Sequence, residues 1–331
     1  MSMKLLYTNN THSIYARGYR LISISHSGER KAIGTLRNPI NSVLSAFRLT
    51  RRFFRAEIIK FYILQDGTQL CIARKGLFRK AKEEKNFSKC FAIPRGSRPM
   101  NICEASDGTL YFGEYFANME KKAVHIYSSE DSGKNWKITY TFPEGNINHV
   151  HGIYRDPYTD RLWFITGDRE NECIIGYSED GFMSMKEVFR GGQDYRSCVL
   201  FFYPAFIVFA TDSQYQKNYI KKFDRKTLEI TTLASVQGPV IKGAQCGNLS
   251  VISTDVEPSD INKDNKAYIW YSKDGLEWKE LYSAEKDILN PTLFQFGVFD
   301  LPIYDCEKTD TIYATGKSLK KCDGKTLIFK I

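Results

Sequence analysis

The chain has 331 residues, of which 42% are hydrophobic and 26% charged, and its formal net charge is +9. These values are ordinary for a globular protein and allow a large core. No apolar run reaches the roughly 18 residues that a membrane-spanning helix needs, so we expect no transmembrane segment. The positive charge favours an anionic partner, but the basic residues are scattered, and we do not expect nucleic-acid binding.

The first residues contain no apolar segment of the kind found in a signal peptide, and the eight cysteines form no C-x-x-C pair. Most of these cysteines lie inside apolar stretches, which is typical of reduced thiols. We therefore expect a cytoplasmic protein.

Residues 41–60 differ from the rest of the chain because they contain the basic run Arg51-Arg52-Phe53-Phe54-Arg55. The segment is predicted to be one helix or an irregular connection. Its charges are most simply solvated, and the alternative is contact with an anionic membrane or a partner protein.

A short motif recurs three times after an apolar strand: a serine, an aspartate two residues later, and then a glycine. The copies occupy residues 129–136, 178–182 and 272–278. Their aspartates are 49 and 94 residues apart, and 94 is twice 47. A degenerate copy is therefore expected midway, at residues 219–227.

A second series has the same period. Apolar strands end in a small residue followed by an acid at Glu114, Asp168, Asp212 and Asp255, with spacings of 54, 44 and 43 residues. Repeats of 40 to 50 residues with several short strands are typical of propeller blades. The sequence thus predicts a single all-β domain over residues 1–331, a seven-bladed β-propeller with four-stranded antiparallel blades. We expect the N-terminal strand, residues 3–7, to close the ring by pairing near residues 326–329.

The three motifs resemble the Asp-box (BNR-repeat) motif, Ser-x-Asp-x-Gly-x-x-Trp, of the sialidase-like superfamily. The resemblance implies that the motif turns join the two outer strands of a blade, on the face opposite the active site. Asp131 and Trp136 are then structural, and Trp136→Ala is expected to cost about 3–5 kcal/mol of stability.

The innermost strand of each blade should precede each acid-terminated strand and line the central channel, where propellers usually bind ligands. His149 and His151 are two apart on one such strand and therefore share a face. Arg98 and Arg196 each lie 16 residues before an acid of the second series. The candidate catalytic residues are His149, His151, Tyr195 and Arg196. The candidate substrate-binding residues are Arg98, Asn101, Glu114, Asp168, Asp212 and Asp255.

Other roles remain open for these residues. The histidine pair could satisfy buried hydrogen bonds, or it could ligate a divalent metal ion with a nearby carboxylate. The acids could cap turns at the strand ends. The arginines need a carboxylate partner from the protein or from a ligand.

The central His, Tyr and Arg set also resembles that of propeller-fold polysaccharide lyases. That resemblance implies a histidine or tyrosine base that removes the proton next to a uronate carboxylate, which arginine or a metal neutralises. We therefore predict a carbohydrate-active protein that acts on an acidic oligo- or polysaccharide at the channel mouth, as a lyase or a glycosidase. The alternative is a non-catalytic propeller that binds a glycan or serves as a scaffold.

Overall fold

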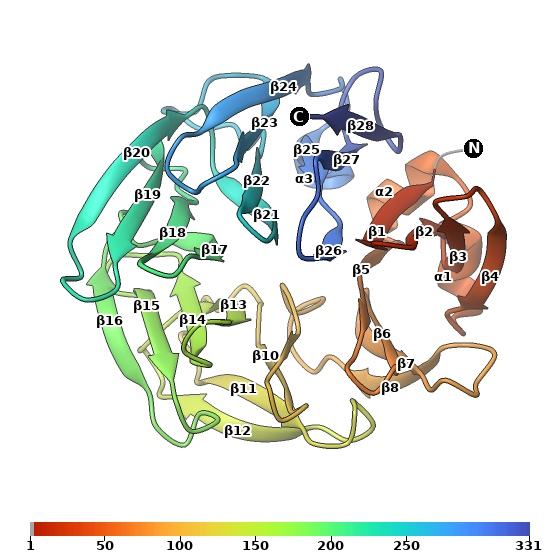
Figure 1. Ribbon diagram of the computed structural model, residues 1–331, viewed down its shortest axis with the longest axis horizontal. Helices are drawn as coiled ribbons and strands as arrows, with labels where there is room; N and C mark the ends of the chain where they lie inside the picture. The colour runs from red at the N-terminus through yellow and green to blue at the C-terminus, as the bar shows by residue number, and fades with distance from the viewer. Residues whose placement is uncertain (1–2) are drawn as a thin grey trace.

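The computed structural model describes residues 3–331, and its sheets stand as blades around a central axis (Figure 1). Five sheets are four-stranded, one is five-stranded and one is three-stranded. Within each blade, consecutive strands pair in antiparallel fashion. The predicted all-β, seven-bladed propeller is confirmed.

The strands of the first three blades are β1 (Lys4–Asn9), β2 (His12–Arg17), β3 (Arg20–Ser25), β4 (Arg30–Thr35), β5 (Ile58–Ile63), β6 (Gln69–Ala73), β7 (Gly76–Lys80), β8 (Ser88–Ala92), β9 (Cys103–Glu104), β10 (Leu110–Gly113), β11 (Val124–Ser129) and β12 (Lys137–Phe142). Blades four to six contain β13 (His149–Arg155), β14 (Leu162–Gly167), β15 (Cys173–Ser178), β16 (Lys186–Gly191), β17 (Ser197–Phe202), β18 (Phe206–Thr211), β19 (Asn218–Asp224), β20 (Ile230–Val236), β21 (Val240–Cys246), β22 (Leu249–Thr254), β23 (Lys266–Ser272) and β24 (Lys279–Glu285). The last segment contains β25 (Val298–Asp300), β26 (Ile303–Asp305), β27 (Thr311–Lys317) and β28 (Thr326–Lys330).

The core lies between neighbouring blades. One cluster joins the third and fourth blades through Ile126, Phe142, Ile153 and Phe164, and similar clusters fill the other inter-blade spaces. Strands buried on both faces read as continuous apolar runs, as in Leu162–Ile165. This packing makes each blade depend on its neighbours, as expected for a propeller.

Ring closure differs from the prediction. The strand β1 is the innermost strand of the first blade and pairs in parallel with β26, with Tyr7 opposite Ile303. The three-stranded last blade has the order β25-β27-β28, and no backbone pairing joins β1 to β28 within residues 3–331. The expected pairing with residues 326–329 was therefore wrong. The ring is closed instead by β26, which follows β25 in the sequence and pairs with β1.

Two short helices, α1 (Pro39–Leu44) and α2 (Arg48–Phe54), connect the first blade to the second. The side chain of Asn38 caps α1, and Pro39 suits its first turn. A third helix, α3 (Pro291–Phe294), contacts α2, where the rings of Phe53 and Phe294 are 5.7 Å apart. Within residues 41–60, helical structure ends at Phe54, and the remaining residues lead into β5. No described helix is long and apolar enough to cross a membrane.

The two faces of the ring carry different connections. The second strand of each blade ends on the face from which the next blade is entered, and we call this the site face. The motif turns join the third strand to the fourth, on the opposite face. In all three, the serine hydroxyl donates to the aspartate at 2.9 Å, in the pairs Ser129–Asp131, Ser178–Asp180 and Ser272–Asp274.

Candidate functional site

A cavity of about 360 Å³ opens around the axis on the site face. Its wall is dense in charge, with both signs represented, and it also includes the aromatic side chains of Tyr115 and Phe296. The cationic residues are Arg55, Arg74, Arg98, Arg196, Lys242 and Lys317, and the acidic residues are Glu57, Asp168, Asp212, Asp255 and Glu257.

A charged residue follows a small residue near the end of the second strand in every blade. The four acids of the sequence series are the members from blades three to six. The other three blades place a cation there: Arg17 after Ala16, Arg74 after Ala73, and Lys317 after Gly316. The ring of strand ends is therefore acidic over four consecutive blades and basic over the remaining three.

Arg196 connects two of the acids. Its Nη2 atom lies 3.0 Å from Oδ1 of Asp168 and 3.6 Å from Oδ2 of Asp212, while its Nε atom is buried with no partner among the described residues. Burial raises the pKa of Asp212, an effect that Arg196 opposes. Arg196 thus fixes two carboxyl groups at the cavity wall.

Arg98 has no carboxylate partner within residues 3–331. Its Nη1 atom lies 3.8 Å from the sulfur of Met100. A half-buried guanidinium without a counter-ion is unfavourable, and a ligand carboxylate can satisfy it bidentately. Arg98 is therefore the clearest anchor for an anion in this cavity.

The carboxyl groups of Asp255 and Glu257 face the same cavity. Burial, followed by the charge of Glu257, raises the pKa of Asp255 well above its usual value. Burial and the charge of Asp212 raise the pKa of Glu257. Oδ1 of Asp255 is buried and has no hydrogen-bond partner within the described chain. Both groups are suited to holding a proton that a free carboxyl would lose.

The histidine pair lies behind the cavity wall. His149 and His151 are almost fully buried, and the ring of Tyr115 covers His149 with a centroid distance of 4.3 Å. Their Nε2 atoms are 2.9 Å apart, and Nε2 of His151 lies 3.1 Å from Oδ1 of Asp168. Among residues 3–331, two groups have the spacing to hold a metal ion: His149 with His151 and Asp168, and His151 with Cys198 and Asp212.

Three of the candidate residues lie away from this cavity. The ring of Tyr195 stacks on Phe189 of the outer strand β16, 5.4 Å between centroids. Asn101 brackets the backbone of Ile153, donating to its carbonyl at 2.7 Å. Glu114 is buried and accepts from Arg95 and from the backbone of His125. Each side chain holds neighbouring strands or loops together.

The sequence reasoning missed several wall residues, and some of them carried a signal. Tyr115 and Glu257 lie one and two residues beyond acids already singled out. Like the acids, Arg74 and Lys317 directly follow a small residue at the end of a strand, and a search for any charged residue at that position would have found them. Arg55 and Phe296 belong to connections between blades, where no repeat pattern applies.

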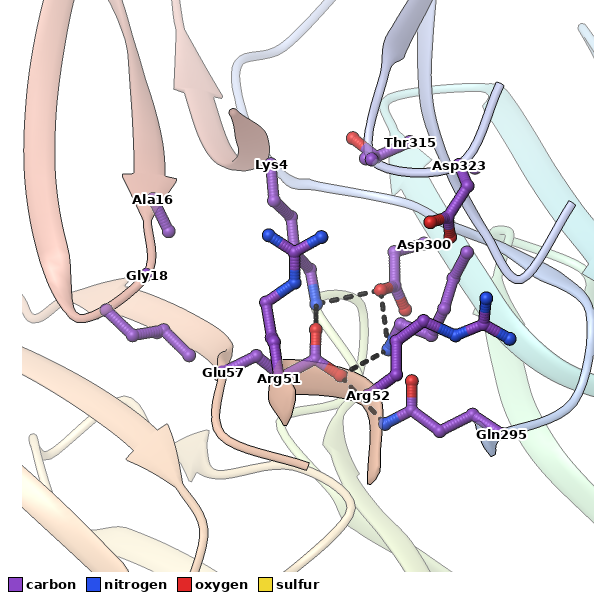
Figure 2. Close-up of a pocket in the computed structure, with 14 residues that line it drawn as sticks. Lys4, Ala16, Gly18, Arg51, Arg52, Glu57, Gln295, Asp300, Thr315 and Asp323 are labelled. Carbon is purple, nitrogen blue, oxygen red and sulfur yellow. Dashed lines mark hydrogen bonds and ion pairs between the residues drawn. The ribbon is translucent and has the colours of Figure 1, made fainter. Parts of the chain in front are cut away.

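A network of ion pairs lies beside the cavity, at the seam between the last and first blades (Figure 2). The ammonium of Lys4 is 2.8 Å from Asp300 and 3.4 Å from Glu57. Lys317 is 2.8 Å from Asp300 and 2.9 Å from Glu57, and Lys242 is 3.3 Å from Asp300. Three lysines thus surround two carboxylates.

Comparison with known proteins supports the fold. No family model and no curated protein matches the chain. A chain of the mitotic checkpoint complex is similar at a TM-score of 0.57 and 11% identity, with 99% of this chain and 89% of that chain covered. The extracellular domain of a hybrid two-component system from B. thetaiotaomicron gives 0.59 at 9% identity, with 99% and 40% covered. A GH74 enzyme from Niastella koreensis gives 0.50 at 11% identity, with 85% and 46% covered. At these identities the likeness shows the propeller fold alone.

Proposed function

We propose that the protein is a carbohydrate-active enzyme that binds an acidic glycan in the site-face cavity and cleaves it there. The observation that carries this proposal is the meeting, in one cavity, of Arg98 without a carboxylate partner and of carboxyl groups whose pKa is raised. A sugar acid presents one carboxylate, which Arg98 can bind, and several hydroxyl groups, which can form hydrogen bonds with the carboxyl groups of the wall.

Hydrolysis suits this wall better than elimination does. A glycosidase needs a carboxylic acid that keeps its proton and a second carboxylate near it. Glu257, half-buried with a raised pKa, has the properties of the proton donor. Asp168 and Asp212, both contacted by Arg196, are the candidates for the second group.

A lyase would need a base that reaches the substrate. His149 and His151 do not line the cavity, and their Nδ1 atoms are engaged with the backbone carbonyls of Phe116 and Ser197. Tyr115 does line it, but burial raises the pKa of its hydroxyl, which therefore keeps its proton near neutral pH and is not available as a base. These contacts favour the glycosidase over the lyase.

The test is a panel of acidic and neutral oligosaccharides, with binding measured by calorimetry and products measured in two ways. Hydrolysis releases a new reducing end alone, and elimination also leaves an unsaturated sugar that absorbs ultraviolet light. We expect acidic members to bind and to yield reducing ends without that absorbance. Binding without products would favour the non-catalytic alternative, and absorbance would favour the lyase.

Two variants separate binding from turnover. Arg98→Ala should weaken binding of an acidic glycan about 10- to 100-fold, because a charge-assisted pair is worth roughly 1.5–3 kcal/mol. Glu257→Gln should bind normally and lose turnover. Arg161 and Glu179 form a pair at 2.7 Å at the opposite face, so Arg161→Ala and Glu179→Gln are matched controls. If Arg98→Ala bound as the parent does, the cavity would not be the glycan site.

A further inference from the structure

The imidazoles of His149 and His151 are held in one tautomer. Nδ1 of His149 lies 2.9 Å from the carbonyl oxygen of Phe116, and Nδ1 of His151 lies 2.8 Å from that of Ser197. A carbonyl oxygen only accepts, so each Nδ1 carries the hydrogen. Both Nε2 lone pairs therefore point inward, toward each other and toward Asp168.

The inward atoms of these three residues have the spacing of metal ligands. The two Nε2 atoms are 2.9 Å apart. Nε2 of His151 lies 3.1 Å from Oδ1 of Asp168, and Nε2 of His149 lies 3.4 Å from Oδ2. Two ligands about 2.05 Å from one ion and at right angles to each other are about 2.9 Å apart. Two lone pairs at this distance repel unless a cation lies between them. Two histidines and one carboxylate form a donor set typical of divalent transition metals.

Surrounding residues hold each ligand in place. Asn148 donates to Oδ2 of Asp168 at 3.0 Å, and Arg196 contacts Oδ1. A side chain at Gly167 would place its Cβ 2.4 Å from Cε1 of His151, so this glycine makes room for the imidazole. Such supporting contacts are a regular feature of metal centres.

We propose that His149, His151 and Asp168 bind one divalent first-row transition metal ion beneath the wall of the cavity. The proposal rests on the ligand geometry alone; with Asp168 as a metal ligand, Asp212 would be the second carboxylate of the proposed glycosidase. The competing occupant of the space between the two imidazoles is a shared proton.

The test uses the full-length protein, treated with EDTA and dialysed, and titrated with Mn²⁺, Zn²⁺ or Co²⁺ by calorimetry. We expect about one equivalent of at least one ion to bind, and bound Co²⁺ to show absorption bands of nitrogen and oxygen coordination. His151→Gln and Asp168→Asn should each weaken binding more than tenfold. His125→Gln, a partly exposed histidine bonded to Thr141, is the control and should bind as the parent does.

A folded parent protein that binds none of these ions would overturn the proposal and leave the shared proton. It would also be overturned if His151→Gln and Asp168→Asn, shown to be folded by circular dichroism, bound as tightly as the parent. Should either variant fail to fold, the stoichiometry and the Co²⁺ spectrum of the parent still decide.

A second inference comes from the surface formed by residues 37–55, which we call the α1–α2 segment. Six of its large apolar side chains are exposed, with Ile40 at 73% and Phe47 at 66%, and the others are Val43, Leu49, Phe53 and Phe54. Ile288 and Leu293, in the connection that contains α3, are exposed as well. Exposed apolar residues rarely gather in this way on a soluble surface without a partner.

The charge of the segment identifies the partner. Residues 37–55 contain five arginines and no aspartate or glutamate. Arg52 is buried and paired with Asp287, and Arg48 pairs with Asp287 and Asp323, whereas Arg37 and Arg55 are exposed and form no ion pair among the described residues. Exposed apolar side chains beside arginines without an acid partner, here Arg37 and Arg55, are typical of a segment that lies in the interface of an anionic membrane.

We infer that the α1–α2 segment docks on an anionic lipid bilayer. The test is cosedimentation with vesicles of phosphatidylcholine alone or mixed with phosphatidylglycerol. We expect binding to the mixed vesicles only, weakened by salt, and a loss of at least tenfold in the variant Ile40→Ser with Phe47→Ser. Met183→Ser with Leu276→Ser, exposed on the opposite face, is the matched control. Equal binding by the two variants, no binding at all, or self-association of the parent through this surface would overturn the inference.

Discussion

Replacing Glu57 with glutamine tests how the ring is held at its seam. The Oε1 atom of Glu57 is 2.9 Å from Lys317 and its Oε2 atom is 3.4 Å from Lys4, and Gln295 donates to it at 3.3 Å (Figure 2). Glutamine keeps the shape of the side chain and removes its charge. The carboxylate of Asp300 would then be the one remaining negative charge paired with the three lysine ammonium groups of this network.

The expected loss can be worked out in two ways. Breaking a buried ion pair by removing one partner costs about 3–5 kcal/mol. The neighbouring lysines lower the pKa of Glu57 from 4.5 to about 2, which corresponds to roughly 3 kcal/mol. Unfolding entropy near 2.1 cal/mol/K per residue gives about 0.7 kcal/mol/K for this chain. Tm should therefore fall by about 4–7 °C at pH 7.

The stability that Glu57 contributes should depend on pH in a defined direction. Because the pKa of Glu57 is lower in the folded protein than in the unfolded chain, its contribution is present above about pH 4.5 and is lost as the pH falls toward 2. The difference in Tm between parent and Glu57→Gln should shrink over that range in scanning calorimetry. Glu130→Gln, which breaks the exposed pair with Lys137, should change stability by less than about 1 kcal/mol. A loss below about 1 kcal/mol for Glu57→Gln, or a loss independent of pH, would refute the reasoning.

Three further substitutions have expected outcomes. Trp136→Ala should cost about 2–4 kcal/mol in urea unfolding, less than a fully buried tryptophan would, because the ring is partly exposed where it packs on Phe112; unchanged stability would contradict a structural role. Asp255→Asn should stabilise the protein at pH 7, because burial raises the pKa of this carboxyl and its ionisation in the folded protein then costs stability as the pH rises above about 4. The gain should vanish below about pH 4, where the carboxyl is protonated in both the folded and the unfolded protein. Equal stability of variant and parent at pH 7 would contradict this. Burial lowers the pKa of Lys60 to about 7, so Lys60→Met should be more stable than the parent at pH 7 by an amount that disappears near pH 10.5, and a pH-independent difference would count against it.

The blade count and the motif turns could be predicted because their chemistry is local. An aspartate that accepts from the backbone within its own turn, as Asp131 does from Asn135 at 2.9 Å, leaves the same short motif wherever the turn recurs. The spacing of these motifs then fixes the period, and the period fixes the number of blades. No tertiary information is needed for either step.

Ring closure could not be predicted in the same way. The strand β26 has three residues and lies within a connection, so no alternation of apolar and polar residues marks it. Its pairing with β1 follows from the geometry of the last blade, which has one strand fewer than the four-stranded blades. The choice between pairing partners for β1 is decided by the whole ring.

Sequence spacing could predict the arrangement of only some residues in the candidate site. Period-two alternation placed His149 and His151 on one face, and the structure brings their Nε2 atoms together. The same reasoning could not tell that Tyr115 would cover them. Tyr195 and Asn101 were assigned from their position near inner strands, and the orientation of side chains there depends on bulges and connections that sequence spacing does not reveal.

The division of charge around the ring supports the proposal that one cavity binds both the carboxylate and the hydroxyl groups of an acidic glycan. Acids follow the second strand in blades three to six, and cations occupy that place in blades seven, one and two, so the two signs form two continuous arcs. Within the acidic arc, Arg196 neutralises part of the charge, and burial raises the pKa of carboxyls such as Asp255. Protonated carboxyls donate and accept hydrogen bonds, as sugar hydroxyls require, whereas the basic arc and Arg98 favour a carboxylate. If the proposed function holds, we expect a glycan that carries one acid group per sugar to bind with its carboxylate toward the basic arc.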